Sequence, residues 1–110
     1  MSAWAFFAEV VRVVDGDTVK LKADVGFRMT FTDNFRLARI DAPEVRGKSA
    51  KKGKEAKEWL IKFLEDNGNK CIIRTIKHGK YRWVCDMYVG DSVSVSDELV
   101  KAGHAKFKDF

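Results

Sequence analysis

Cysteine and proline are scarce in this chain, and no long apolar run is present. The two cysteines, Cys71 and Cys85, stand alone inside apolar, strand-like segments without a Cys-x-x-Cys pair, so we expect neither a zinc site nor a redox site. We interpret both as buried thiols, and a disulfide between neighbouring strands stays open because sequence does not report geometry. No apolar stretch approaches the length that spans a bilayer.

The first nine residues lack the basic start of a secretion signal and lead directly into a strand-like alternation. We therefore expect a cytoplasmic protein, with secretion left open if a leader was trimmed from the chain. The composition, 45% hydrophobic and 34% charged, is typical of a folded globular chain. No linker, repeat or low-complexity segment divides the 110 residues, so we predict one domain over residues 1–110.

The formal net charge of +5 favours an anionic partner such as nucleic acid. Acidic residues nevertheless gather at the predicted turns of this basic chain: Asp15, Asp17, Asp41 and Glu44. Carboxylates concentrated at turns of a basic protein indicate a local cation. The residue types available for such a cation are oxygen donors, because no His and Cys set accompanies them.

The only proline, Pro43, lies between two of these acids, after the apolar run of residues 35–40. Proline has no N–H and a fixed φ, so a central strand stops there, and the residue before it is held extended. The carbonyl of Ala42 therefore has a set direction, and Asp41 and Glu44 lie at the rim of a sheet on stiff backbone. Carboxylates at such positions often do no more than cap a turn, so this tetrapeptide alone does not decide between structure and chemistry.

Alternating apolar residues predict five main strands and one short strand, over residues 6–14, 17–25, 35–40, 71–76, 81–89 and 93–95. The pair Asp15-Gly16 predicts a hairpin turn between the first two strands. Gly26 predicts a bend or bulge, residues 29–32 prolong the hairpin arm, and Asp33-Asn34 predicts the next turn.

A helix is predicted from Ser49, as its N-cap, to about residue 66, with Asn67-Gly68 as its left-handed stop. Its apolar stripe, which we assign to the core, consists of Ala56, Trp59, Leu60, Phe63 and Leu64. The lysines of this segment are interpreted as a solvated face that also attracts a polyanion.

Ser96 predicts the cap of a second, short helix over residues 97–102, and Gly103 predicts its end. Five strands with a helix inserted after the third predict a mainly β protein with helices (α+β), built as a five-stranded OB-type barrel. Barrels of this type bind ligands on one face and in neighbouring loops, which is where the acids are expected.

Closure of such a barrel brings Asp17, at a hairpin turn, towards Asp41, at a strand end. Two carboxylates and the carbonyl of Ala42 form an incomplete oxygen shell, which suits a hard divalent ion such as Ca²⁺ completed by water and a substrate phosphate. Asp15 lies close enough in sequence to act through a coordinated water.

Two arginines, Arg36 and Arg82, are candidates for a phosphate clamp, because guanidinium groups bind phosphate oxygens in pairs and keep their charge. Arg36 precedes Asp41 by five residues, so on a regular strand the two side chains point to opposite faces. A bulge or twist near residues 38–39 has to rotate Arg36 into the site. The alternative is that either arginine is a surface residue.

With these residues in place, the sequence resembles the staphylococcal nuclease (thermonuclease-like) family. The resemblance extends from about Val10 to Lys106, and includes the family's inserted helix, second helix and return strand. It depends on the order and spacing of three motifs, Val-Asp-Gly-Asp-Thr-Val at 14–19, Phe-Arg-Leu with Ile-Asp-Ala-Pro-Glu at 35–44, and Gly-Lys-Tyr-Arg at 79–82.

The resemblance implies an OB-type barrel with added helices and Ca²⁺-dependent hydrolysis of DNA and RNA phosphodiester bonds, leaving 3′-phosphate ends. By motif position, Asp17 and Asp41 are implied as metal ligands, with the Ala42 carbonyl as a third. Glu44 is implied as the general base for the attacking water, or as the group that orients it.

The same resemblance implies that Arg36 and Arg82 stabilise the pentacoordinate phosphorus. It also implies that Lys80 and Tyr81 lie near the substrate phosphate. This chain has Lys-Tyr-Arg where the family usually has Lys-Tyr-Gly-Arg, one residue more. The family's long C-terminal helix is missing from the sequence, and with it tyrosines that flank the nucleotide in some relatives. We expect a monomer or weak self-association.

Two other function classes stay open on sequence alone. One is a non-catalytic OB-type module that binds nucleic acid, single strands favoured, without cutting it. The other is a structural or partner-binding barrel in which the acidic motifs are only turns. The retained acids favour the enzyme, because metal-phosphate chemistry needs that set.

Overall fold

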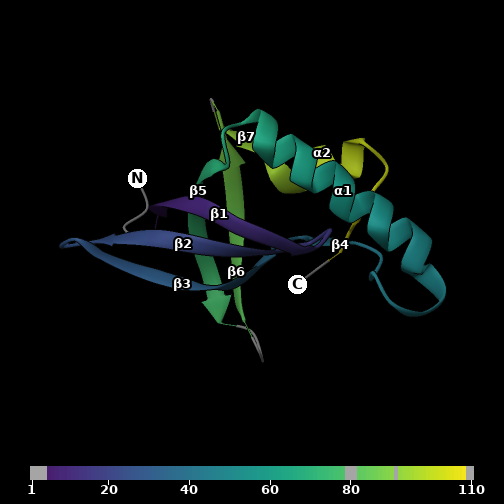
Figure 1. Ribbon diagram of the computed structural model, residues 1–110, viewed down its shortest axis with the longest axis horizontal. Helices are drawn as coiled ribbons and strands as arrows, with labels where there is room; N and C mark the ends of the chain where they lie inside the picture. The colour runs from purple at the N-terminus through teal and green to yellow at the C-terminus, as the bar shows by residue number, and fades with distance from the viewer. Residues whose placement is uncertain (1–4, 79–81, 91, 109–110) are drawn as a thin grey trace.

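The computed structural model describes residues 5–78, 82–90 and 92–108, and its elements are drawn in Figure 1. In chain order they are β1 (Ala5–Asp15), β2 (Thr18–Gly26), β3 (Met29–Leu37), β4 (Ile40–Asp41), the 3-10 helix η1 (Gly47–Ser49), α1 (Ala50–Asp66), β5 (Lys70–His78), β6 (Trp83–Val89), β7 (Val93–Ser94), α2 (Val95–Lys101) and β8 (Lys106–Phe107).

Five strands close into a barrel. The sheet runs in the order β3-β2-β1-β5-β6-β7, and a further pairing of β3 with β6 closes strands β3, β2, β1, β5 and β6 into a ring, to which β7 is added beside β6. The closing pair is parallel, whereas the other pairs of this sheet are antiparallel. Strands β4 and β8 form a separate two-stranded sheet beside the barrel. The predicted five-stranded OB-type barrel with two helices is therefore confirmed.

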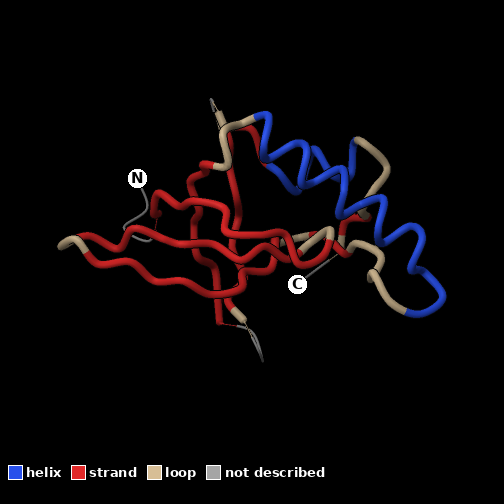
Figure 2. The backbone as a smooth tube through the Cα atoms, in the orientation of Figure 1, coloured by secondary structure: helices blue, strands red, loops and turns tan. Residues whose placement is uncertain are grey.

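The core follows the alternation of side chains along the strands, because every second residue of a strand faces the same side. Fully buried side chains fill the barrel and lie under the helices: Val19, Leu21, Phe35, Leu37, Ile40, Leu60, Leu64, Ile73, Cys85, Met87, Val95 and Leu99. Both helices lie on the side of the barrel away from the tip of the β2–β3 hairpin (Figure 2). Neither α-helix that the structure describes has the length and apolar character needed to cross a bilayer.

The predicted turn at Asp33-Asn34 is wrong. Strand β3 runs through both residues, with Asp33 opposite Leu21 and Asn34 opposite Lys20. The Asp33 carboxylate does accept the backbone N–H of Asn34 at 2.8 Å, the local bond that marks many turns, but cross-strand pairing keeps the backbone extended. The chain reverses earlier, at residues 27–28, where both φ angles are positive, as a type I′ turn requires. The register shift between Asp24 and Gly26 confirms the bulge predicted at Gly26.

The C-terminal ends of the helices were predicted more accurately from the sequence than their N-terminal starts. Gly68 (φ 74°) and Gly103 (φ 82°) both adopt the left-handed conformation predicted for them. The short helix α2, however, is capped by Ser94, whose hydroxyl accepts the N–H of Asp97 at 3.3 Å. The prediction that Ser96 caps this helix is wrong, because the Ser96 hydroxyl is buried and donates to a distant carbonyl. Ser49 lies in η1, and its predicted capping contact falls outside what the structure describes.

Helix α1 buries a narrower stripe than predicted. Its buried residues are Gly53, Ala56, Leu60 and Leu64. Trp59 and Phe63 are only half-buried, so their assignment to the core holds in part: they pack at its border and stack on each other with ring centroids 4.9 Å apart.

Small residues let α1 approach the turns that carry the acidic motifs. A Cβ on Gly53 would overlap the carbonyl group of Glu44 and the backbone nitrogen of Val45. A Cβ on Gly16 would lie 2.8 Å from the Cβ of Ala56 and 3.1 Å from that of Ala42. Both motif segments are thus held against the same helix face.

Replacing Gly53 with alanine tests this close approach. Gly→Ala inside a helix ordinarily stabilises by about 0.5–1 kcal/mol, because glycine loses more conformational freedom on folding. Here we expect the opposite sign, a loss of about 1–3 kcal/mol in the free energy of unfolding, because the new methyl group meets backbone. Urea denaturation measures the change. The neighbouring exposed variant Lys54→Ala serves as the control, with a change within about 0.5 kcal/mol. A Gly53→Ala protein as stable as wild type would contradict the packing described.

Both cysteines are buried free thiols, as predicted. Burial raises the pKa of Cys71 from 9.0 to about 12, because a thiolate loses its hydration inside the protein. Burial also raises the pKa of Cys85, to which the negative charges of Cys71 and Asp86 add. The folded state therefore holds its thiol protons to higher pH than the unfolded chain does.

Cys71 is consequently expected to make stability fall at alkaline pH. Its contribution is complete below pH 9.0 and is lost as the pH rises towards about 12, since only the unfolded thiol ionises in that window. One such thiol steepens the decline by about 1.4 kcal/mol per pH unit. Urea denaturation across this window should give a shallower decline for Cys71→Ala than for wild type. Equal slopes would show that the Cys71 thiol does not titrate differently in the two states.

Candidate active site

Asp17 joins the β1–β2 turn to the segment around Pro43. Its side chain is almost fully buried, with the residue 5% exposed. One carboxylate oxygen accepts the backbone N–H of Ala42 at 3.1 Å, and the other accepts the Thr18 hydroxyl at 3.1 Å. The carbonyl of Asp17 accepts the N–H of Leu37 at 2.8 Å. Residues from two distant motifs are therefore in direct contact.

The chain turns between Arg36 and Asp41. Strand β3 ends at Leu37, Arg39 has a φ of 67°, and β4 begins at Ile40. The sequence required a bulge or twist at residues 38–39 to turn Arg36 towards Asp41, and the structure has a turn at that place, with Arg39 in the left-handed conformation.

Arg36 lies between the two acids. Its Nη2 is 3.4 Å from Oδ2 of Asp17 and 3.3 Å from Oδ1 of Asp41, and it donates to the carbonyl of Ile40 at 3.3 Å. The Arg36 side chain is 15% exposed, whereas that of Asp41 is 49% exposed. Lys108 approaches Asp41 from the solvent side, at 3.9 Å. The two carboxylates thus share one positive group, and one of them faces solvent.

Glu44 is positioned through its backbone. Its carbonyl packs against Gly53 of α1, while its side chain is exposed. Over the described ranges the Glu44 carboxylate makes no ion pair or hydrogen bond, so it faces water. A groove of about 480 Å³ adjoins Asp41 and Ala42 on the surface between α1 and the segment 103–106.

Arg82 precedes β6 by one residue. Strand β6 pairs in parallel with the end of β3, where Arg36 lies opposite Val84, so Arg82 comes two residues before the partner of Arg36. Its Nε is buried and, among the described residues, has no hydrogen-bond partner. The structure shows no ion pair of Arg82 with the described carboxylates. The predicted substrate-binding residues Lys80 and Tyr81 lie outside the described residues.

The donor set fits a hard cation in part. Two convergent carboxylates are present, and oxygen ligands are those that Ca²⁺ prefers. The part of the chain that the structure describes holds no group of three or more His, Cys, Asp or Glu side chains arranged around a common metal position. Asp17, Asp41 and the Ala42 carbonyl would therefore supply a minority of a shell of six to eight oxygens, leaving the rest to water and substrate.

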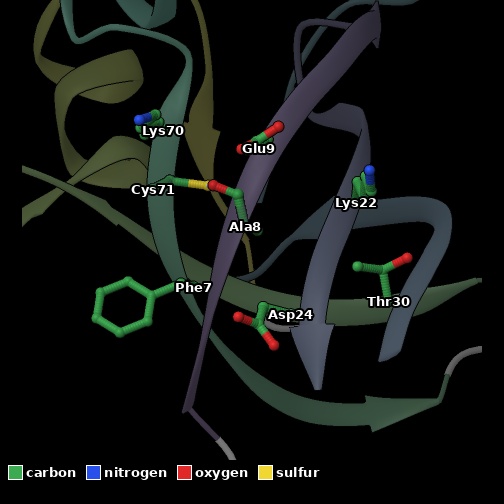
Figure 3. A pocket seen from close by; sticks show the side chains of 8 residues that line it. All are labelled: Phe7, Ala8, Glu9, Lys22, Asp24, Thr30, Lys70 and Cys71. Atoms are coloured by element: carbon green, nitrogen blue, oxygen red, sulfur yellow. The ribbon is translucent and has the colours of Figure 1, made fainter. Parts of the chain in front are cut away.

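A second hollow, of about 350 Å³, lies on the outer face of the barrel, away from the acidic motifs. Figure 3 shows its lining side chains, which come from β1, β2, β3 and β5, with the sulfur of Cys71 directed at the Ala8 carbonyl. That contact is 3.7 Å long. The lining mixes Glu9 and Asp24 with two lysines, and none of it belongs to the candidate site.

The geometry defines a class: an OB-type barrel whose rim brings together two carboxylates and an arginine from separate motifs. The family model described as staphylococcal nuclease homologue matches residues 34–110. The chain belongs to this family, which is nuclease-related. The match includes Arg36, Asp41, Glu44 and Arg82, while Asp17 lies before it and joins the site through its contacts.

Sequence reasoning missed the residues that support the site. Arg39 interrupts the apolar run 35–40, and Asp86 interrupts the apolar run 83–89. A charged residue inside an apolar strand is a signal that could have found both, because such a group needs a buried partner. Gly53, alone inside a helical pattern, was a further signal of close packing.

The ion pair between Arg36 and Asp17 can be tested by a double-mutant cycle. Arg36→Met leaves the buried Asp17 carboxylate without its ion pair, and we expect a loss of about 3–5 kcal/mol in the free energy of unfolding. In an Asp17→Asn background the same change should cost less, giving a coupling energy of about 1–3 kcal/mol. Urea denaturation of the four proteins measures it. Lys108→Met, at an exposed pair, should change stability by less than about 0.5 kcal/mol. Strict additivity of the two substitutions would refute the contact.

Proposed function

We propose that this chain is a Ca²⁺-dependent nuclease that hydrolyses phosphodiester bonds of DNA, RNA or both and leaves 3′-phosphate ends. The observation that carries the proposal is the convergence of Asp17, Asp41 and Arg36 at the barrel rim. Glu44, with an exposed side chain, follows Asp41 by three residues. Membership of a nuclease-related family supports the same reaction class.

Asp17, Asp41 and the carbonyl of Ala42 would hold the cation. The buried, doubly hydrogen-bonded Asp17 gives the site a fixed ligand, and the half-exposed Asp41 gives it an accessible one. A bound Ca²⁺ supplies charge neutralisation of the scissile phosphate and a template for its orientation.

Glu44 accepts a proton from the attacking water, or orients that water by a hydrogen bond. The water oxygen forms a bond to phosphorus, the bond from phosphorus to the 5′ oxygen breaks, and that oxygen takes a proton from solvent. Phosphate then stays on the 3′ side. Arg36 and Arg82 bind the phosphate oxygens as negative charge builds on them. Lys80 and Tyr81 are assigned to the substrate phosphate by motif position.

We expect weak base selectivity, because contacts to phosphate carry no sequence information. Single strands are the favoured substrate, since their backbone bends more freely into a rim site than a duplex does. The protein should act as a monomer or with weak self-association.

One observation favours a second candidate, a module that binds nucleic acid without cutting it. The pair Asp17 and Asp41 already shares a cation, the guanidinium of Arg36, so the acids have a role without metal. Hydrolysis requires that Arg36 also serve the phosphate, whereas simple binding does not.

Cleavage of labelled single-stranded DNA tests the proposal directly. With Ca²⁺ we expect products bearing 3′-phosphate, identified by mass spectrometry, and no products with chelator. Glu44→Gln should lower kcat by about 100-fold or more, because positioned proton transfer contributes that much. Because its side chain is exposed, folding should be unchanged, as checked by the melting temperature.

Glu65→Gln, an equally exposed change at the far end of α1, is the matched control and should cleave like wild type. Oligonucleotide binding without cleavage, with and without Ca²⁺, would establish the binding module instead. Cleavage by Glu44→Gln at the wild-type rate would remove the assigned role of Glu44.

A further inference from the structure

The turn at residues 38–39 needs support from elsewhere in the fold. Arg36 and Asp41 face each other only because the chain turns between them, and Arg39 adopts a φ of 67° to make that turn. This conformation costs an L-residue roughly 1–2 kcal/mol, and glycine is the residue that adopts it without penalty. An arginine at such a position therefore points to contacts that hold it.

The backbone of the turn is held by three separate segments. The N–H of Ala38 donates to the carbonyl of Cys85 in β6 at 2.8 Å. The carbonyl of Ala38 accepts the buried hydroxyl of Ser96 in α2 at 2.9 Å. The carbonyl of Arg39 accepts the N–H of Lys108, just after β8, at 2.8 Å.

The Arg39 side chain reaches over the start of α2. Its Nε lies 3.3 Å from Oδ1 of Asp86, its Nη1 lies 3.2 Å from Oδ1 of Asp97, and its Nη2 lies 3.3 Å from the Ser94 hydroxyl. Asp86 is 4% exposed, and its other oxygen lies 3.4 Å from Nη2 of Arg74. We call Arg39, Asp86, Ser94, Ser96 and Asp97 the turn clamp.

The electrostatics of the turn clamp are favourable. Burial by itself lowers the pKa of Arg39, but the hydrogen bond and negative charge of Asp86, followed by the charge of Asp97, raise the pKa overall. The Arg39 side chain is 45% exposed, but Asp86 is buried, and a buried carboxylate is costly to leave without its cationic partners. The clamp therefore favours a single arrangement of the turn.

We propose that the turn clamp positions the guanidinium of Arg36 against Asp17 and Asp41, and that Arg39 and Ser96 are positioning residues of the site. The catalytic consequence rests on the proposed function, whereas the geometric part does not. None of the clamp side chains makes a hydrogen bond or ion pair with Asp17, Asp41 or Glu44 among the described residues, so the effect passes through the backbone of the turn.

Two matched variants separate positioning from loss of an ion pair. Arg39→Gln and Arg74→Gln each remove one guanidinium from Asp86, but only Arg39 belongs to the turn. With single-stranded DNA and Ca²⁺, Arg39→Gln should lower kcat by about tenfold or more, since small misplacements of reacting groups cost that much. Its KM should stay within about twofold, and Arg74→Gln should keep both constants within about twofold. Arg39→Lys keeps a positive charge next to Asp86, so this variant should recover part of kcat.

A second readout is independent of cleavage. The NMR signals of the Arg36 guanidinium report its pairing with the two acids, and they should move in Arg39→Gln and Ser96→Ala but not in Arg74→Gln. A wild-type protein that does not cut would overturn the proposed nuclease, while this pattern of shifts would still support the positioning role. Equal kcat losses in the Arg39 and Arg74 variants, or Arg36 signals unmoved in Arg39→Gln, would overturn the positioning role.

Discussion

The contact of one guanidinium, that of Arg36, with two carboxylates is the interaction on which the rest of the site depends. Asp17 is buried, and a buried charge is tolerated only when it is paired and hydrogen-bonded. Arg36, the Thr18 hydroxyl and the Ala42 N–H together meet that requirement. Satisfying Asp17 therefore fixes the hairpin turn, the end of β3 and the start of the segment at Pro43 relative to one another.

Two glycines make this arrangement compatible with the core. Gly53 lets α1 touch the backbone at Glu44, and Gly16 lets the β1–β2 turn lie against Ala56. The same helix face continues into the hydrophobic core through Leu60 and Leu64. The position of α1 therefore determines both the packing of the core and the placement of the acidic motifs, and it depends on the absence of side chains at Gly16 and Gly53.

The fold and the candidate acids could be predicted from sequence because local chemistry determines them. Proline ends a central strand because it lacks an N–H, so Pro43 marks a strand end. Glycine readily adopts a left-handed conformation, so Gly68 marks a helix end. The wrong predictions concern residues whose partners are distant. Asn34 is typical of a turn, but its pairing with β2 keeps it in a strand. Ser96 is typical of a helix cap, but its hydroxyl donates to the carbonyl of Ala38 in a distant segment. For the turn clamp of Arg39, the charged residues within apolar runs were a signal, but their partners could not be named because three segments separated in sequence contribute to it.

Barrel closure has a consequence for how the protein matures. Strands β3 and β6 pair in parallel although a long stretch of chain separates them in sequence. Such non-local pairing loses much chain entropy before the contacts between the strands stabilise it. Arg36 belongs to one of these strands and Arg82 immediately precedes the other. In a nascent or partly unfolded molecule with an open ring, β3 and β6 are not paired, so the segments that carry Arg36 and Arg82 are not held side by side.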